Sequence, residues 1–165
     1  MTASSPQPIT VESSAGHKYI DILQDVIKRM AGNSANCKSL CITLVSAIAV
    51  VVTDKQKSSY VWITLIPVVL FCFLDAYYLG LEQGFRVTYD EFVRKLQNGV
   101  ATTKDLFLVI PKGKIKKHQA DSSTTLETKS FNPVDGTLKA LRSVAVYPFY
   151  LTLLVLLLLG RLLSF

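Results

Sequence analysis

Three long apolar blocks limit what this chain can fold into. They cover residues 37–53, 60–80 and 144–163, and the third contains the run LTLLVLLLLG. In an α-helix, about 20 apolar residues cross the hydrocarbon core of a bilayer, which is roughly 30 Å thick. The sequence therefore predicts three transmembrane helices.

The first block is the shortest, with 17 residues, and Lys38 lies at its edge. A lysine ammonium in that position can extend to the membrane surface. Only the polar sequence DKQKSS at 54–59 separates this block from the second, so we expect a transmembrane hairpin. The alternative is a first block that is buried in the protein or lies at the membrane interface.

Composition excludes several classes of protein. Half of the 165 residues are hydrophobic, 18% are charged, and the mean hydropathy is +0.35. A water-soluble enzyme domain displays more charge than this, a disordered chain is less apolar, and a disulfide scaffold holds more cysteine. The three cysteines lie in or beside the apolar blocks, which argues against structural disulfides.

The basic residues predict the orientation. Of the 18 lysines and arginines, four lie in residues 1–40, two in 54–59, eleven in 81–143 and one at the C-terminal end. Cytoplasmic segments next to membrane spans carry an excess of basic residues. We therefore expect the N-terminus and residues 81–143 in the cytoplasm, with the C-terminus on the opposite side.

The predicted fold class is an all-α membrane protein with three transmembrane helices. Its expected parts are a disordered N-terminus (1–16), an amphipathic cytoplasmic helix (17–36), the transmembrane hairpin (37–80), a cytoplasmic helical extension with a basic loop (81–143), and a C-terminal transmembrane helix (144–165).

An apolar stripe begins in the amphipathic segment and continues into the first span. Residues on one face of a helix recur at intervals of three and four. The stripe predicts one long helix, and its small members would let another helix approach closely. We expect it to form a self-association seam, or alternatively to pack within the chain or lie on the membrane. Its residues are Ile20, Leu23, Ile27, Met30, Ser34, Cys37 and Cys41.

The second span carries a carboxylate, Asp75, about five residues from its cytoplasmic end. A charge inside a bilayer is costly, and such residues usually serve a function. We predict a polar brace between helices formed by Asp75, Tyr78, Glu82 and Arg86. The alternative is a hydrated carboxylate at the interface, because the other spans offer no evident ionisable partner.

The helical pattern continues beyond the second span, with acid-then-base pairs four residues apart. We expect one rod that is kinked at Pro67 and stops at Asn98-Gly99. The run at 106–110 predicts a strand or a membrane-proximal patch, and residues 134–142 predict a short helix.

A basic patch follows at Lys112, Lys114, Lys116 and Lys117. Near an anionic membrane each lysine contributes about 1 kcal/mol, so we expect lipid contact and a topology signal. The alternative is a nucleic-acid or protein partner.

Motifs for catalysis and metal binding are missing from the sequence. It contains no GxSxG, P-loop, HExxH or GxGxxG motif. The pair Cys37 and Cys41 would need two more metal ligands, and His17 and His118 lack the spacing to supply them. We expect neither an enzyme nor a cofactor or metal site.

Two stretches carry a family resemblance: RMAGNSANCKSLCITLVSAI at 29–48 and FLDAYYLGLEQGFRVTYDEFV at 73–93. Together they resemble small bacterial membrane proteins that act as effectors of anti-phage systems, including the transmembrane effectors of some retrons. The second stretch is also similar to a RipA-like octameric family of membrane proteins.

The resemblance implies an effector of abortive infection in the bacterial inner membrane. A partner, such as a reverse transcriptase with its nucleic acid, would hold it inactive, and its release would let homo-oligomers permeabilise the lipid bilayer. The C-terminus would then be periplasmic. The alternatives are a non-toxic oligomeric scaffold that recruits cytoplasmic partners, and a channel or transporter subunit.

Overall fold

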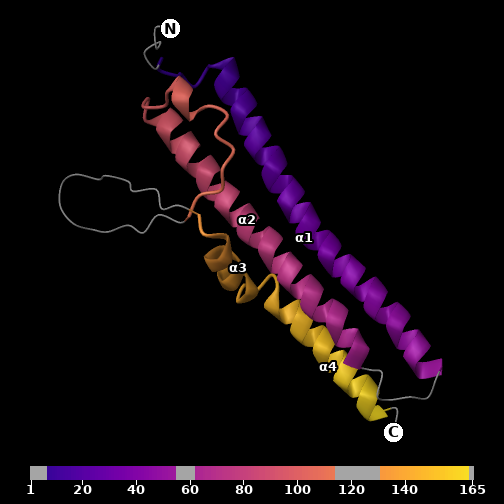
Figure 1. The fold of residues 1–165 in the computed structure, drawn as a ribbon. Coiled ribbons are helices and arrows are strands. Elements are labelled where there is room, and N and C mark those ends of the chain that lie inside the picture. Colours follow the sequence, from indigo (N-terminus) through magenta and orange to yellow (C-terminus); the bar gives the residue numbers. More distant parts are fainter. Residues whose placement is uncertain (1–6, 55–61, 114–130, 164–165) are drawn as a thin grey trace, which may run out of the picture. The chain divides into compact units, whose positions relative to one another are not determined.

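The computed structural model describes residues 7–54, 62–113 and 131–163, in which the regular elements are helices (Figure 1). In chain order these are α1 (Ser14–Asp54), α2 (Leu65–Gln97), the 3₁₀ helix η2 (Thr103–Asp105), α3 (Pro133–Leu141) and α4 (Tyr147–Leu163). The predicted all-helical fold is confirmed for the described residues.

The chain divides into two compact units, and α1 and α2 contribute residues to both. We call Met1–Arg29 with Leu81–Asn132 the polar unit, and Met30–Gly80 with Pro133–Phe165 the apolar unit. The boundary at residue 80 coincides with the predicted end of the hairpin. Helix α3 belongs to the apolar unit, although the sequence placed it with the cytoplasmic segment 81–143.

Helix α1 is continuous over 41 residues, as the extended apolar stripe predicts. Its start follows Ser13, whose carbonyl accepts a hydrogen bond from His17 N at 3.1 Å. The Ser13 hydroxyl lies 3.5 Å from Gly16 N. Serine is favoured at this position because its side chain can satisfy a free N–H of the first turn.

Helix α2 begins close to Pro67, which lies in its first turn. A 3₁₀ turn at 62–64 leads into the helix, and the proline is its third residue. The N–H groups of a first turn have no partner within the helix, so proline breaks no hydrogen bond there. The expected rod is confirmed as the continuous helix Leu65–Gln97, and the kink at Pro67 stays a prediction that its place in the first turn does not favour.

The predicted stop at Asn98-Gly99 is confirmed. Val100 N donates to Lys95 O at 3.0 Å, and Gly99 N donates to Leu96 O at 3.2 Å. These two bonds form a Schellman cap, which needs a residue with positive φ. Gly99 has φ of 69° and meets that need without strain.

Residues 7–13 are ordered in the polar unit, which corrects the expectation of disorder up to residue 16. Pro8 and Thr102 form an isolated bridge, and Ile9 N donates to Ala101 O at 2.9 Å. Ile9 is only 5% exposed. The apolar side chain and the backbone bonds together fix a segment whose composition suggests a loop.

The core of the polar unit lies between the first turns of α1 and the last turns of α2. Tyr19 and Leu23 are buried against Phe92 and Leu96. The rings of Tyr19 and Phe92 meet edge to face with centroids 4.7 Å apart. These contacts bring the two helices together in antiparallel order.

The core of the apolar unit surrounds α2, which packs against α1, α3 and α4. The Tyr150 hydroxyl donates to Phe71 O at 3.0 Å, joining α4 to α2. The short helix predicted at 134–142 is confirmed as α3. The buried residues of this core are Cys41, Val45, Val68, Ala76, Ala140, Val146 and Tyr150.

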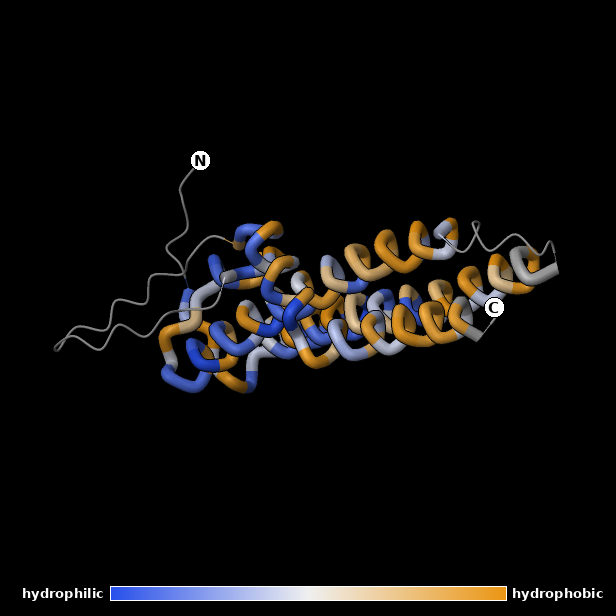
Figure 2. The backbone as a smooth tube through the Cα atoms, turned by 90° about the horizontal axis from the view of Figure 1, so that it is seen from below, coloured by the Kyte–Doolittle hydropathy of each residue, from blue (hydrophilic) through white to orange (hydrophobic). Residues whose placement is uncertain are grey.

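Two helices contain stretches long and apolar enough to cross a membrane, within Ser14–Val51 and Trp62–Gln97. Only 22% and 33% of these stretches are buried, unlike the core helix of a soluble protein. Helix α4 is strongly apolar but has 17 residues, fewer than the predicted third span. Figure 2 shows hydrophobic residues along α4 and along the parts of α1 and α2 in the apolar unit.

Residues 106–110 do not form a strand. The Ile110 carbonyl accepts a hydrogen bond from the Thr88 hydroxyl at 2.7 Å, and Lys112 N donates to Gly84 O at 3.0 Å. The segment is therefore attached to α2 within the polar unit. The side chains of Phe107, Leu108, Val109 and Ile110 remain exposed.

Candidate functional site

The candidate site is a polar cluster around Asp75 in the apolar unit. The Asp75 side chain is 0% exposed, on the face of α2 that packs inward. Its Oδ1 accepts a hydrogen bond from the Ser34 hydroxyl. Its Oδ2 lies 2.6 Å from the ammonium of Lys38, and the two groups form an ion pair. The angles of this contact do not meet the geometry of a hydrogen bond.

Both partners of Asp75 come from one face of α1. Ser34 and Lys38 are four residues apart, so their side chains lie one helical turn from each other. Lys38 Nζ also lies 3.4 Å from Ser34 Oγ, which makes the serine a donor to the carboxylate and an acceptor from the ammonium. The cluster joins α1 to α2 through three linked contacts.

The charges of Asp75 and Lys38 cancel inside an apolar environment. Removing one partner of a buried ion pair costs about 3–5 kcal/mol, because the other charge is left uncompensated. Lys38 keeps a side-chain exposure of 23%, so its ammonium has a route to solvent that the fully buried carboxylate lacks. The cluster thus fixes the pairing of the helices.

Lys38 corrects one expectation from the sequence, which gave Asp75 no ionisable partner. The expected position of Lys38 at the membrane surface stays a prediction. A signal for the pairing was present. Lys38 lies 16 residues before Asp54, and Asp75 lies 16 residues after Ser59. Two antiparallel helices joined by the loop 54–59 therefore bring the two residues to the same level.

The other members of the predicted polar brace lie elsewhere. Glu82 and Arg86 form an ion pair at 2.8 Å within the polar unit. The Tyr78 ring packs against Tyr77, with centroids 5.8 Å apart. The contacts of Asp75 that the structure gives among the described residues run to α1, so the brace is a cluster between two helices.

The predicted self-association seam lies mostly inside the chain. Leu23 belongs to the core of the polar unit, and Ile20 packs against that core. Ser34, Cys37 and Cys41 are buried in the apolar unit, while Ile27 and Met30 are half-buried. The buried members pack within the chain, which was the stated alternative, and a role in assembly stays a prediction.

A second ionic cluster attaches the segment after α2 to the polar unit. Glu91 lies 2.8 Å from the ammonium of Lys112 and 3.4 Å from that of Lys95. Lys95 also pairs with Asp105 at 2.7 Å, and the Thr102 backbone N–H donates to the same carboxylate at 3.0 Å. Lys112, predicted to meet lipid, is thus engaged within the chain.

Protonation equilibria in this cluster are displaced. Burial raises the pKa of the Glu91 carboxyl, but the ammonium groups of Lys112 and Lys95 lower it by more, so it stands below its ordinary value. The pKa of Asp105 is also lowered, because hydrogen bonds from Lys95 and Thr102 outweigh its burial. Burial raises the pKa of Tyr19 to about 12.

Tyr19 holds the same segment from the other helix. Its hydroxyl donates to Leu108 O at 2.7 Å. The roles of Tyr19 and Asp105 could not be predicted from the sequence, because their local spacing does not indicate contacts with residues far away in the chain.

The rest of the predicted basic patch lies outside the described residues. The expected contact of Lys114, Lys116 and Lys117 with lipid therefore stays a prediction.

No group of three or more histidine, cysteine, aspartate or glutamate side chains suited to a metal occurs among residues 7–54, 62–113 and 131–163. No protein-family model matches the chain, and neither a curated protein nor a solved structure shows significant similarity to it.

Proposed function

We propose that this chain is a three-span membrane protein that self-associates and permeabilises the bacterial inner membrane as an effector of anti-phage defence. In this proposal α1 crosses outward, α2 returns, and α4 crosses again. The polar unit and the basic segment stay in the cytoplasm, and the C-terminus is periplasmic.

One observation carries the membrane part of the proposal. The apolar unit exposes large hydrophobic side chains on α1, α2 and α4, yet it buries a neutralised pair of charges in its interior. A soluble domain arranges these features the other way round. Ionisable residues inside a membrane bundle usually face inward and pair with one another.

The defence part rests on the family resemblance. The stretch 29–48 contains Ser34 and Lys38, and the stretch 73–93 contains Asp75. The resemblance thus includes all three residues of the polar cluster. The same resemblance implies that a partner restrains the effector. It also implies the permeabilising action.

The test is induction of the gene in a bacterium while growth and membrane potential are followed with a voltage-sensitive dye. We expect depolarisation before viability falls. Asp75→Leu should abolish toxicity at unchanged membrane levels, whereas Asp90→Leu should not, because Asp90 is an exposed acid on the same helix in the polar unit. Unchanged potential at confirmed expression would contradict the permeabilising action.

A double variant separates loss of folding from loss of action. Lys38→Met with Asp75→Leu removes both charges and leaves neither uncompensated. If the polar cluster is needed for toxicity itself, this variant reaches wild-type levels in the membrane and remains harmless. Full toxicity of the double variant would limit the cluster to a role in stability.

One observation favours the second candidate, a non-toxic scaffold that recruits cytoplasmic partners. Phe107, Leu108, Val109 and Ile110 form a run of exposed apolar side chains in the polar unit. Exposed apolar patches on polar surfaces often mark protein contacts. Induction without any growth defect, together with co-purification of a partner that Ile110→Ser abolishes, would favour the scaffold.

A further inference from the structure

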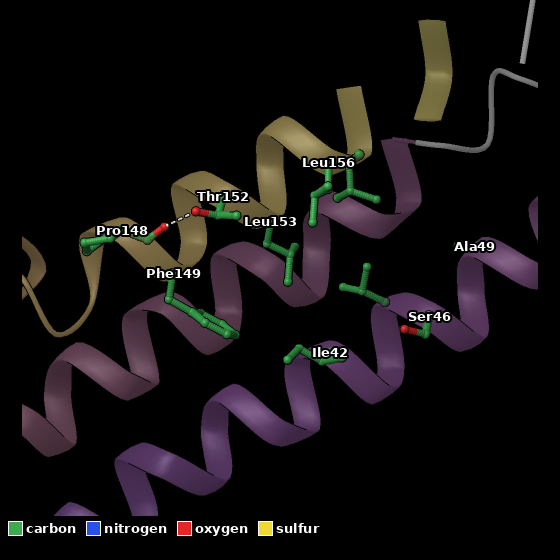
Figure 3. A pocket seen from close by; sticks show the side chains of 10 residues that line it. Ile42, Ser46, Ala49, Pro148, Phe149, Thr152, Leu153 and Leu156 are labelled. Carbon is green, nitrogen blue, oxygen red and sulfur yellow. Dashed lines mark hydrogen bonds between the residues drawn. The ribbon is translucent and has the colours of Figure 1, made fainter. Parts of the chain in front are cut away.

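Helix α4 is shorter than the hydrocarbon core of a bilayer. Its 17 residues rise about 25 Å in an α-helix, and the hydrocarbon core is roughly 30 Å thick. Pro148 lies in the first turn of α4 (Figure 3), where its carbonyl accepts a hydrogen bond from the Thr152 hydroxyl at 2.8 Å. A proline farther inside a helix would lose a hydrogen bond and clash with the preceding turn, so α4 cannot begin earlier. A crossing by α4 therefore needs another element beside its first residues.

The level at which α4 begins follows from its contact with α2. The Tyr150 hydroxyl donates to Phe71 O at 3.0 Å, so these two residues lie side by side. The two helices run in opposite directions (Figure 1). Tyr147, the first residue of α4, therefore lies near the level of Leu74 on α2.

Helix α3 lies against α2 just beyond that level. A Cβ atom built on Gly80 would lie 3.0 Å from the backbone carbon of Gly136, so the two backbones are in close contact. Gly80 follows Leu74 by six residues, which is about 9 Å along α2. Helix α3 thus occupies the depth that α4 lacks, and with nine residues it is too short to cross a membrane itself.

Helix α3 has three faces, each a stripe of residues with helical spacing. The first face packs inward, with Gly136 against Gly80 and with Ala140 buried in the core. The second face is apolar, and its members are Val134, Leu138 and Leu141. The third face is charged and ends just beyond the helix, and its members are Asp135, Lys139 and Arg142.

The apolar face of α3 continues the apolar surface of the unit. Leu141 packs against the core cluster that contains Val146 and Tyr150. Val134 and Leu138 lie on the same stripe but are 63% and 57% exposed. A helix at a membrane surface has this arrangement, with apolar side chains toward the acyl chains and charged side chains toward the headgroups.

We infer that α3 is an interfacial helix that binds phospholipid in the cytoplasmic leaflet. Val134 and Leu138 enter the acyl chains, and Lys139 and Arg142 contact phosphate groups. The occupant is lipid, because a helix that completes the depth of a span meets acyl chains on its apolar side. The inference rests on the membrane location in the proposed function, and it adds the lipid partner and the residues that meet it.

The charged face favours anionic phospholipid. Asp135 lies in the first turn of α3, where the helix N-terminus stabilises a carboxylate. Lys139 and Arg142 are exposed near the other end. The face keeps one net positive charge, which attracts an anionic leaflet.

Fluorescence quenching by brominated phospholipids tests this placement with the full chain in phosphatidylcholine vesicles. The sequence contains one tryptophan, so Trp62→Phe gives a background into which single tryptophans are introduced. Bromine in the upper half of the acyl chains should lower the emission of Leu138→Trp or Val134→Trp about twofold. Asp135→Trp is the matched control on the charged face, and it should keep most of its emission.

A further variant separates this inference from the proposed function. Leu156, shown on α4 in Figure 3, is 63% exposed, so Leu156→Trp reports whether α4 is in the bilayer. Quenching of Leu156→Trp but of neither Leu138→Trp nor Val134→Trp would overturn the inference and retain the crossing by α4. Without quenching of Leu156→Trp, the membrane part of the proposed function fails and the inference fails with it.

Two other results would also overturn the inference. Equal quenching of Asp135→Trp and Leu138→Trp would remove the distinction between the two faces of α3. Blue-shifted emission of Leu138→Trp without quenching would mean that protein, such as a second copy of the chain, covers the apolar face.

The phosphate contact has its own test. Brominated phosphatidylglycerol should quench Leu138→Trp about twofold more than brominated phosphatidylcholine at equal mole fraction. Lys139→Gln with Arg142→Gln should remove this preference. Lys28→Gln with Arg29→Gln changes the same residue types at exposed positions of the polar unit and should leave it unchanged. Equal quenching by the two lipids before any charge is removed would overturn the phosphate contact.

Discussion

Asp75 and Lys38 are not equivalent partners, although they carry equal and opposite charges. The carboxylate is fully buried, whereas the lysine side chain is 23% exposed at the end of a flexible stem. A lysine that loses its partner can extend its ammonium toward solvent. The aspartate has no such route, so loss of the lysine should cost more than loss of the aspartate.

This asymmetry gives the first prediction. Lys38→Met should lower the unfolding free energy by roughly 3–5 kcal/mol, and Asp75→Asn by less, because Ser34 can still donate to an amide oxygen. The double variant Lys38→Met with Asp75→Leu should recover most of the loss. Thermal unfolding in detergent micelles measures all three, and equal losses for the two single variants would refute the asymmetry.

The carboxylates of the polar unit make its stability depend on pH. The pKa values of Glu91 and Asp105 are lower in the folded chain than in the unfolded chain. Their contribution is complete above the unfolded values, which are about 4, and is lost as pH falls through the lower folded values. The segment after α2 should therefore loosen in acid.

Hydrogen exchange measured by mass spectrometry tests this, with rates corrected for the intrinsic effect of pH. Protection of residues 100–112 should decline between about pH 5 and pH 2. Asp105→Asn should show weaker protection at neutral pH and a shallower decline. Protection that is constant over this range would mean that the ionic cluster does not hold the segment.

At the level of elements, close contact between α2 and α3 depends on Gly80. A Cβ atom built on Gly80 would lie 3.0 Å from the backbone carbon of Gly136. Backbone cannot move aside as the end of a side chain can. Gly32 on α1 has nothing within 4 Å of the corresponding position, which makes it a matched control.

The third prediction compares these two glycines. Gly80→Ala should destabilise the protein by about 1–3 kcal/mol, since it overpacks the helix contact. Gly32→Ala should stabilise it by about 0.5–1 kcal/mol, because alanine has the higher helix propensity. Unfolding of both variants in the same detergent measures the difference, and a neutral Gly80→Ala would mean that α3 can move away freely.

The elements also show which features the sequence could reveal. The period of the apolar stripe predicted α1 as one helix, and Asn98-Gly99 predicted the end of α2, because both signals are local. The pairing of Lys38 with Asp75 needed the register of the hairpin. Ile9 and Ala101 are even farther apart in the sequence, and the local composition around them does not predict their contact.

At the scale of the whole molecule, the sequence predicted a separation of polar and apolar parts, and the two units reproduce it. It could not predict that α3 packs with the apolar unit, because that depends on how closely Gly80 and Gly136 approach. It also could not tell that most of the predicted assembly seam is used within the chain.

The most direct test of the account is the membrane topology of the full chain. Green fluorescent protein at the N-terminus and alkaline phosphatase either within the loop 54–59 or after Phe165 report the side on which each point lies. Three spans predict fluorescence from the first fusion and phosphatase activity from both of the others. An inactive phosphatase after Phe165 would mean that α4 does not cross, and an inactive one in the loop would contradict the transmembrane hairpin itself.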